Sequence, residues 1–202
     1  MAAFTVGHSV LSLEDFFNLL RMHKIKTLVD VRSVPFSPRN PQFNRTELDH
    51  SLTKAGFNYH FMGDTLGGRP FDESHYHENG IANYLAVRES KSFSDALAKF
   101  MIWAKEENAT LMCGEEDPIT CHRALMITPA LAKLKVFPNH IRKEGVIETH
   151  RMFILRTSMQ AKILKTPQLP SLFSDDTEDR LFEDAVEKLA KNMLTEEQKN
   201  KS

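Results

Sequence analysis

Short apolar runs alternate with amphipathic segments along the first 150 residues of the chain. The apolar runs are rich in β-branched and aromatic side chains, which is typical of buried strands. We expect strands at residues 4–6, 27–32, 57–62, 109–113 and 137–142, with a further strand at 146–149 that pairs with the last. Strands that alternate with helices predict a mostly parallel sheet covered on both faces.

The segments between these runs carry start and stop signals for helices. Ser12 is an expected N-cap with Asp15 three residues later, and Asn44 has the same relation to Glu47. Apolar residues follow each cap at helical spacing. Gly56 fits the left-handed backbone position that ends the second of these helices.

Two further helices are predicted in the second half of the domain. Apolar residues recur at helical spacing over residues 93–104. Another helix is expected from Cys121 to Leu134, where Pro129 should kink or shorten it because proline has no N–H for the helix ladder. The segments 33–43 and 71–80 lack a helical period and are expected to be loops.

The C-terminal part differs from the rest of the chain. Residues 1–165 form the predicted α/β domain, 166–174 predict a proline-containing linker, and 175–202 predict an acidic amphipathic helix. The elements together predict a three-layer α/β sandwich with a mostly parallel sheet of about five strands and a C-terminal helical extension. The apolar stripe of the last helix needs a partner surface. We expect either the body of this chain or a second copy, which would give a homodimer.

Composition narrows the class of protein. The chain has 202 residues, a formal net charge of −1 and 41% hydrophobic residues, which is typical of a soluble globular domain. It has no apolar run of about 18 residues and no secretory signal at its start. Two cysteines cannot build a disulfide scaffold, so we expect a cytoplasmic protein without a membrane partner. The near-zero charge also argues against a general polyanion binder, although residues 174–198 hold much of the acid and leave the body slightly positive.

Polar and reactive side chains gather where the predicted strands end. Ligands bind at the carboxyl edge of open parallel sheets, because loops diverge there and helix N-termini point into the gap. The sequence therefore predicts that residues far apart in the chain surround one shared site. The clusters are Gly7-His8-Ser9, Asp30-Val31-Arg32, Leu66-Gly67-Gly68-Arg69, and Cys113-Gly114-Glu115-Glu116 continuing to Cys121-His122-Arg123.

The sharpest motif joins Cys113 and Cys121 with the basic pair His122 and Arg123. At the start of a helix, the dipole and free N–H groups would stabilise a Cys121 thiolate. Cys121 could be a nucleophile, half of a redox pair with Cys113, or a metal ligand, and both cysteines could instead be small buried hydrophobes. Two irregularly spaced cysteines lack a second ligand pair, so we predict no metal site, although His8 could add a ligand. The sequence leaves any cofactor unidentified.

Four arginines suggest an anionic ligand. Guanidinium groups bind phosphate in a bidentate way, and glycines let the backbone approach it closely. Arg32 could equally form a structural ion pair with Asp30. The expected substrate- or anion-binding residues are Ser9, Arg32, Arg39, Gly67, Gly68, Arg69, Cys113, His122 and Arg123. The expected catalytic residues are Cys121, a general acid or base at Asp30 or Glu115, and a proton carrier at His8.

These clusters, in this order, resemble the family known as domain of unknown function 488 (DUF488), which includes the YeaO-like proteins. The resemblance covers about residues 3–150 and implies a compact three-layer α/β domain, while implying little about the reaction. Gly114 departs from the alanine or serine more usual there. The matching stretches are Thr5-Val6-Gly7-His8-Ser9, Leu28-Val29-Asp30-Val31-Arg32, Pro38-Arg39-Asn40-Pro41-Gln42-Phe43, Leu66-Gly67-Gly68-Arg69, and Met112-Cys113-Gly114-Glu115 through Cys121-His122-Arg123.

Three functions fit these residues. The first is an enzyme, a hydrolase or transferase, that acts on a phosphate-bearing substrate such as a nucleotide or nucleic acid. The second is rhodanese-like sulfur transfer through Cys121, although here the cysteine follows the long loop rather than opening it. The third is a non-catalytic module that binds a nucleotide or nucleic acid.

One segment of the tail, residues 168–173, is similar to the short Gln-x-x-Leu-Phe peptides that dock on the bacterial sliding clamp. Its spacing is one residue longer than the pentapeptide form. We therefore expect its Leu-Phe pair to pack back onto its own domain.

Overall fold

The fold is built on one six-stranded sheet. The structure, a computed structural model, describes residues 3–165 and 175–199. The strand order is β3-β2-β4-β1-β5-β6, and every neighbouring pair is parallel except β5 with β6. The α/β prediction is confirmed, and the last strand pairs with β5 as expected, in the antiparallel direction. The bounds are β1 Ala3–Gly7, β2 Thr27–Asp30, β3 Asn58–Phe61, β4 Ala109–Cys113, β5 Pro138–Ile141 and β6 Ile147–Glu148.

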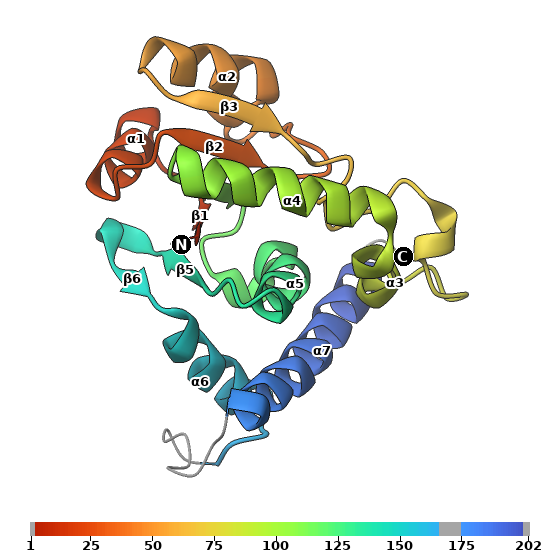
Figure 1. Ribbon diagram of the computed structural model, residues 1–202. Coiled ribbons are helices and arrows are strands. Elements are labelled where there is room, and N and C mark those ends of the chain that lie inside the picture. The colour runs from red at the N-terminus through yellow and green to blue at the C-terminus, as the bar shows by residue number, and fades with distance from the viewer. Residues whose placement is uncertain (1–2, 166–174, 200–202) are drawn as a thin grey trace.

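Helices cover both faces of the sheet, as Figure 1 shows. On one face, α1 and α2 pack on apolar side chains of the central strands such as Leu28 and Met112. On the other face, α4 and α5 pack on the sheet, whose side chains such as Val29 and Leu111 point the opposite way, and α7 packs against α5 and α6. The helices are α1 Leu13–Met22, α2 Arg45–Lys54, α3 Tyr84–Glu89, α4 Lys91–Glu106, α5 Thr128–Lys133, α6 His150–Gln160 and α7 Asp175–Lys199.

The local helix signals are mostly confirmed. The Ser12 hydroxyl accepts from the N–H of Asp15 at the start of α1, and Gly56 has φ +84 after α2. Asn44 differs from the prediction, because its side chain accepts from the N–H of Ser37 instead of capping α2. The Asn44 amide therefore fixes the preceding loop rather than the helix.

The segment that follows Cys121 is not one continuous α-helix. It begins as a π-helical turn, Arg123–Ile127, and continues as α5. Pro129 lies in the first turn of α5, where it has no N–H to donate. The N–H and the hydroxyl of Thr128 both donate to the carbonyl of Arg123, which closes the π turn. The predicted disturbance by Pro129 thus takes the form of a π turn directly after the cysteine.

The helix α7 lies along the body of its own chain. Phe182, Ala185 and Val186 are at most 1% exposed, and Phe182 packs against the rings of Phe153 and His150. The apolar stripe of α7 therefore packs on the body of its own chain, which is one of the two expected partner surfaces. A homodimer through α7 stays a prediction. The expected linker at 166–174 and the clamp-like segment at 168–173 lie outside the described residues. Among the residues described, no helix has both the length and the apolar character needed to cross a bilayer.

His150 gives the fold a pH dependence that can be measured. The ring lies between Phe137 and Phe182, and neither nitrogen has a hydrogen-bond partner in the described part of the chain. Burial lowers the pKa of His150 from 6.5 to about 4. Below pH 6.5 the unfolded chain takes up a proton that the folded chain refuses, so the unfolding free energy falls with falling pH, by about 2 kcal/mol at about pH 5.

A His150→Phe variant should lose this part of the pH dependence, because phenylalanine fits an aromatic site and cannot take up a proton. We expect the stability difference between variant and wild type to grow by about 2 kcal/mol between about pH 7.5 and about pH 5. Urea unfolding at both pH values measures it. The same exchange at the exposed His77 is the control and should leave the pH dependence unchanged. Parallel pH curves for the wild type and the His150 variant would contradict the assignment.

Candidate functional site

A pocket of about 460 Å³ lies at the carboxyl edge of the sheet. It collects all four polar clusters predicted from the sequence, together with apolar residues from two helices. This convergence is the predicted geometry. The lining residues are His8, Ser9, Val10, Arg32, Ser33, Val34, Phe36, Ser37, Asn40, Gly68, Arg69, Tyr84, Cys113, Gly114, Glu115, Thr120, Cys121, His122 and Met193.

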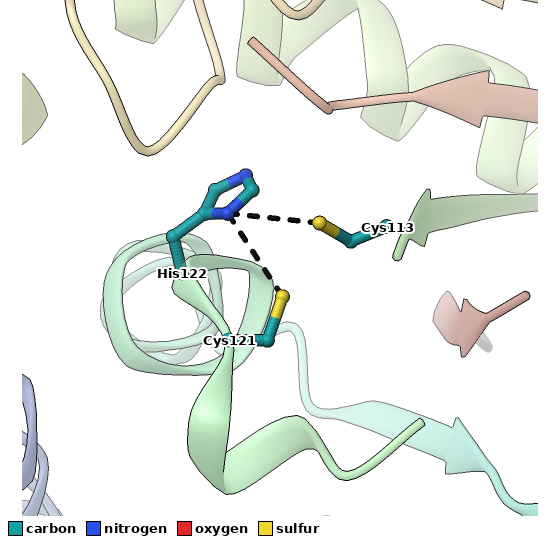
Figure 2. A group of neighbouring side chains, drawn as sticks. All are labelled: Cys113, Cys121 and His122. Atoms are coloured by element: carbon teal, nitrogen blue, oxygen red, sulfur yellow. Dashed lines mark hydrogen bonds between the residues drawn. The ribbon is translucent and has the colours of Figure 1, made fainter. Parts of the chain in front are cut away.

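Two thiols and an imidazole meet on the wall of this pocket. Cys113 is the last residue of β4, while Cys121 and His122 stand immediately before the π turn. The Nδ1 atom of His122 lies 3.8 Å from the Sγ atom of Cys113 and 3.9 Å from that of Cys121, as Figure 2 shows. We call these three residues the thiol cluster. Both cysteines are free and buried, and both line the pocket.

The orientation of His122 is fixed from outside the cluster. Its Nε2 atom is 2.9 Å from the carbonyl oxygen of Val31, an acceptor, so Nε2 carries the proton. The Nδ1 atom faces the two sulfurs; burial opposes protonation of the ring, but the charge of Cys121 and its hydrogen bond to the ring raise the pKa of His122. The sequence analysis predicted that His122 binds an anion. In the structure its ring contacts the two thiols instead.

The electrostatics of the cluster separate its two thiols. Burial opposes ionisation of Cys121, but the hydrogen bond from Cys113, the charge of Arg123 and the neighbouring His122 lower the pKa of Cys121 well below its usual value. The pKa of Cys113 is raised by its hydrogen bond to Cys121 and by burial. Cys121 is accordingly the thiol that ionises first.

Glu115 adds a carboxyl group to the same wall. Burial and the charge of Cys121 raise its pKa, and its side chain interacts with both sulfurs. Its backbone passes very close to β1, since a Cβ atom on Gly7 would lie 1.7 Å from the Glu115 carbonyl oxygen. The glycine in the first cluster thus makes room for the loop that carries Glu115. We call Glu115 and the thiol cluster together the reactive cluster.

Arg32 is the buried cation of the pocket and is 7% exposed. Its Nε and Nη2 atoms donate to the Asp30 carboxylate at 2.9 and 2.6 Å, and Nη2 also donates to the Phe43 carbonyl. Asp30 accepts a further bond from the Tyr59 hydroxyl. Asp30, which we had expected to be a general acid or base, is completely buried and holds Arg32 in place. The structural ion pair, one of the two alternatives for Arg32, is confirmed.

His8 also contacts Arg32. The ring donates from Nδ1 to the Ser9 carbonyl and accepts at Nε2 from Arg32 Nη1 at 3.1 Å. Burial and the charge of Arg32 lower the pKa of His8 to about 4, so the ring is neutral at physiological pH. With both nitrogens engaged, His8 positions Arg32 in this structure, and its role as a proton carrier stays a prediction.

Arg123 does not reach the pocket. It is completely buried and donates to the carbonyl oxygens of Glu115 and Glu116 at 2.7 and 2.9 Å, and to the Thr5 hydroxyl at 3.4 Å. The anion contact predicted for it is replaced by a clamp on the loop after β4. Arg39 is exposed and does not line the pocket either.

The glycines of the third cluster act through close packing. A Cβ atom on Gly68 would lie 2.8 Å from the Cβ atom of His122, and one on Gly67 would lie 2.3 Å from the Ser33 hydroxyl. Gly68 lines the pocket and Gly67 does not. The two glycines thus let this segment pack directly against His122 and Ser33. Arg69, the next residue, is exposed and lines the pocket.

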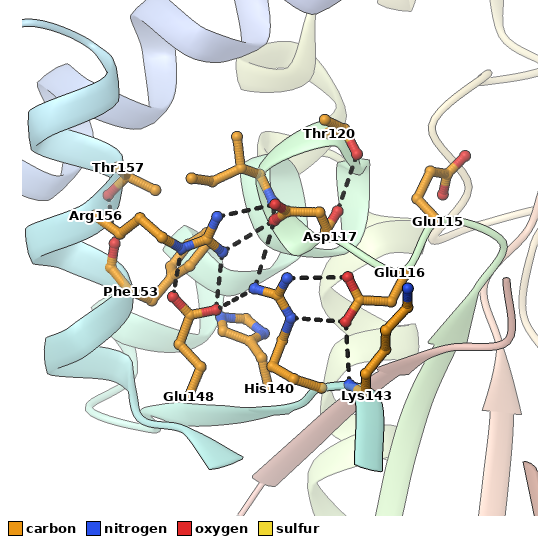
Figure 3. A network of polar contacts seen from close by, with 12 residues as sticks. Glu115, Glu116, Asp117, Thr120, His140, Lys143, Glu148, Phe153, Arg156 and Thr157 are labelled. Carbon is orange, nitrogen blue, oxygen red and sulfur yellow. Dashed lines mark hydrogen bonds and ion pairs between the residues drawn. The ribbon is translucent and has the colours of Figure 1, made fainter. Parts of the chain in front are cut away.

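An ion-pair network that the sequence analysis missed supports the loop from behind. Arg142 pairs with Glu116 and Glu148, and Arg156 pairs with Asp117 and Glu148, all at 2.6 to 3.0 Å. Figure 3 shows the pairs that Arg156 makes with Asp117 and Glu148. Asp117 also accepts from the N–H of Ile119 at the start of the turn before Cys121. The loop between Cys113 and Cys121 is therefore held at several points, which fixes the distance between the two thiols.

The pocket has an apolar rim that the sequence also did not reveal. Val10, Val34 and Phe36 line it and are 79, 62 and 65% exposed. Tyr84 from α3 and Met193 from α7 complete the wall. Their contribution had no sequence signal, because α3 is too short to show a helical period and Met193 lies far along the chain from the other clusters.

A family model, Domain of unknown function DUF488, matches residues 12–128 of the chain. The matched stretch contains Arg32, Arg69 and the whole reactive cluster, whereas His8 and Met193 lie outside it. Neither the curated proteins nor the solved structures that were compared gave a match.

Proposed function

The chain belongs to the DUF488 family of domains of unknown function, and from its pocket we propose an enzyme that acts on a phosphate-bearing substrate, a nucleotide or nucleic acid. The observation that carries the proposal is that Arg32 and Arg69 line the same cavity as the reactive cluster. A cation that binds a phosphate would thereby hold the substrate next to the groups that do the chemistry.

The environment of Arg32 suits an anion. Four of its five N–H donors have partners within the described residues, namely Asp30, Phe43 and His8. One Nη1 donor is left on a guanidinium that is already held in position and that lines the cavity. A fixed donor loses little conformational entropy when it binds, which favours a charge-assisted bond to a phosphate oxygen.

The apolar rim supports a nucleotide rather than free phosphate. Phe36 offers an exposed ring within the lining of the pocket. Aromatic rings bind nucleobases by stacking, and stacking tolerates any base because every base has a π-face. Phosphate on Arg32 and Arg69 and a base on Phe36 would hold the substrate in the pocket that the reactive cluster lines. In this proposal Cys121 and Glu115 carry the chemistry.

Binding of phosphate compounds to two arginine variants tests the proposal. The sequence analysis predicted both arginines, Arg39 and Arg69, to bind the anion. Arg69→Ala removes an exposed cation of the pocket, while Arg39→Ala removes an exposed cation outside it. For nucleoside mono-, di- and triphosphates and short single-stranded oligonucleotides, we expect Arg69→Ala to weaken binding by about 10-fold or more, since a charged hydrogen bond contributes about 1.5–3 kcal/mol. Arg39→Ala should bind like the wild type. Titration calorimetry at several salt concentrations measures both, and affinity should fall as salt rises.

Three results would count against the proposal. Equal losses in the two variants would show that the pocket is not the site. Flat binding from low to high salt would exclude phosphate contacts. Binding without turnover of any compound in the panel would favour the alternative of a non-catalytic module.

Sulfur transfer is less well supported by the same geometry. Cys121 lines the pocket, as a sulfur carrier must, but it is only 2% exposed. A second thiol, that of Cys113, also contacts the His122 ring. A persulfide on Cys121 would be open to attack by the Cys113 thiol, which would form a disulfide and release hydrogen sulfide. Intact mass after incubation with thiosulfate tests this alternative, and added sulfur retained on Cys121 would favour it.

A further inference from the structure

The thiol cluster has the donor atoms and spacing of a metal centre. Its two Sγ atoms and the Nδ1 atom of His122 all lie within 4.8 Å of one another. Atoms that bind one zinc ion tetrahedrally, at about 2.3 Å for sulfur and about 2.0–2.1 Å for nitrogen, are held at comparable mutual separations. We propose that Cys113, Cys121 and His122 bind a zinc ion through Sγ, Sγ and Nδ1.

The second contact of His122 supports a ligand role. A histidine that binds a metal through one nitrogen almost always donates its other N–H to a carboxylate, a carbonyl or water. Here Nε2 donates to the Val31 carbonyl at 2.9 Å, so Nδ1 is the nitrogen that faces the sulfurs and that would bind the ion. Gly68 packs against the Cβ atom of His122 and further limits its movement.

The choice of metal follows from the donors. Two thiolates and an imidazole are soft and borderline ligands, which favour zinc over calcium or magnesium. The loop between the thiols is clamped by Arg123 and by the network around Arg142 and Arg156. A donor set that is held in position before the ion arrives has little ordering left to do on binding.

The cluster faces the pocket with one side, because all three ligands are among its lining residues. Zinc sites with three protein ligands keep a fourth position for water or substrate, and catalytic sites with two cysteines and one histidine are of this kind. The inference rests on the proposed function only for the role of the ion, and it changes Cys121 from a nucleophile to a ligand. It also revises our prediction from the cysteine spacing, which did not count His122 as a ligand.

Cobalt titration of the full-length reduced protein tests the site without any substrate. After removal of metal with a chelator, Co²⁺ should bind one ion per chain and give the sulfur-to-metal charge-transfer band and the intense visible absorption of tetrahedral thiolate coordination. One equivalent of Zn²⁺ should abolish both signals. His122→Ala, Cys113→Ser and Cys121→Ser should each weaken Zn²⁺ binding by more than about 100-fold, whereas His77→Ala, which removes an exposed imidazole elsewhere, should not.

A second measurement uses the unaltered protein, in case a variant does not fold. Zn²⁺ should protect both thiols from alkylation by iodoacetamide, and Mg²⁺ should not. Absence of the charge-transfer band, equal alkylation with and without Zn²⁺, or full Zn²⁺ affinity in a folded His122→Ala variant would overturn the inference. Normal cobalt coordination by the unaltered protein, together with its failure to bind any of the phosphate compounds, would remove the proposed function and leave the metal site standing.

Discussion

Asp30→Ala is expected to lower the unfolding free energy by about 3–5 kcal/mol, because it leaves the Arg32 guanidinium buried without its counter-ion. Asp30 is completely buried and accepts from the Arg32 backbone N–H, from Arg32 Nε and Nη2, and from the Tyr59 hydroxyl. Guanidinium chloride unfolding measures the change as a lower midpoint at an unaltered slope. A loss below about 1 kcal/mol, the usual limit for an exposed pair, would show that the pair is not buried in solution.

The double variant Asp30→Ala/Arg32→Met separates the penalty of an unpaired charge from the value of the pair itself. Removing both charges should restore most of the lost stability, since apolar replacement of a buried pair is often close to neutral. Asp64→Ala, which removes an exposed carboxylate, is the matched control and should be near neutral. A double variant as unstable as the single one would show that the loss comes from the space vacated by Asp30.

Arg123→Met is expected to destabilise the protein by about 3 kcal/mol and to loosen the loop between Cys113 and Cys121. Methionine keeps much of the side-chain volume but cannot donate, so the carbonyl groups of Glu115 and Glu116 lose their partner at 2.7 and 2.9 Å. An acceptor left unpaired in the interior costs about 1–3 kcal/mol. Guanidinium chloride unfolding measures the stability.

Hydrogen exchange of the N–H groups in residues 114–117 should accelerate in Arg123→Met, and this measurement locates the effect on the loop. The variant Arg39→Met, at an exposed position, serves as the control. It should change neither the unfolding free energy nor the rate of hydrogen exchange in the loop. Unaltered exchange in this loop together with lowered stability would mean that Arg123 stabilises the core without fixing the loop.

The local signals in the sequence succeeded where a few neighbouring residues decide the structure. The strand at 109–113 is observed at its predicted bounds, and the Ser12 cap and the left-handed Gly56 follow from contacts within one turn. The helices α3 and α6 were missed for related reasons. The first has six residues, and the buried face of the second carries the polar residues His150, Thr157 and Ser158 beside Phe153 and Ile154, so no apolar stripe appears in the sequence.

The sequence by itself determined the α/β architecture and the meeting of four polar clusters at one edge, because a parallel sheet brings the carboxyl ends of its strands together. Only the tertiary structure decided what each polar side chain does there. Arg32 and Arg123 both end a polar cluster in the sequence, yet Arg32 lines the pocket, whereas Arg123 donates to the carbonyl groups of Glu115 and Glu116. His122 is directed at the thiols by a carbonyl 91 residues away, and the choice of partner for a long polar side chain depends on such distant contacts.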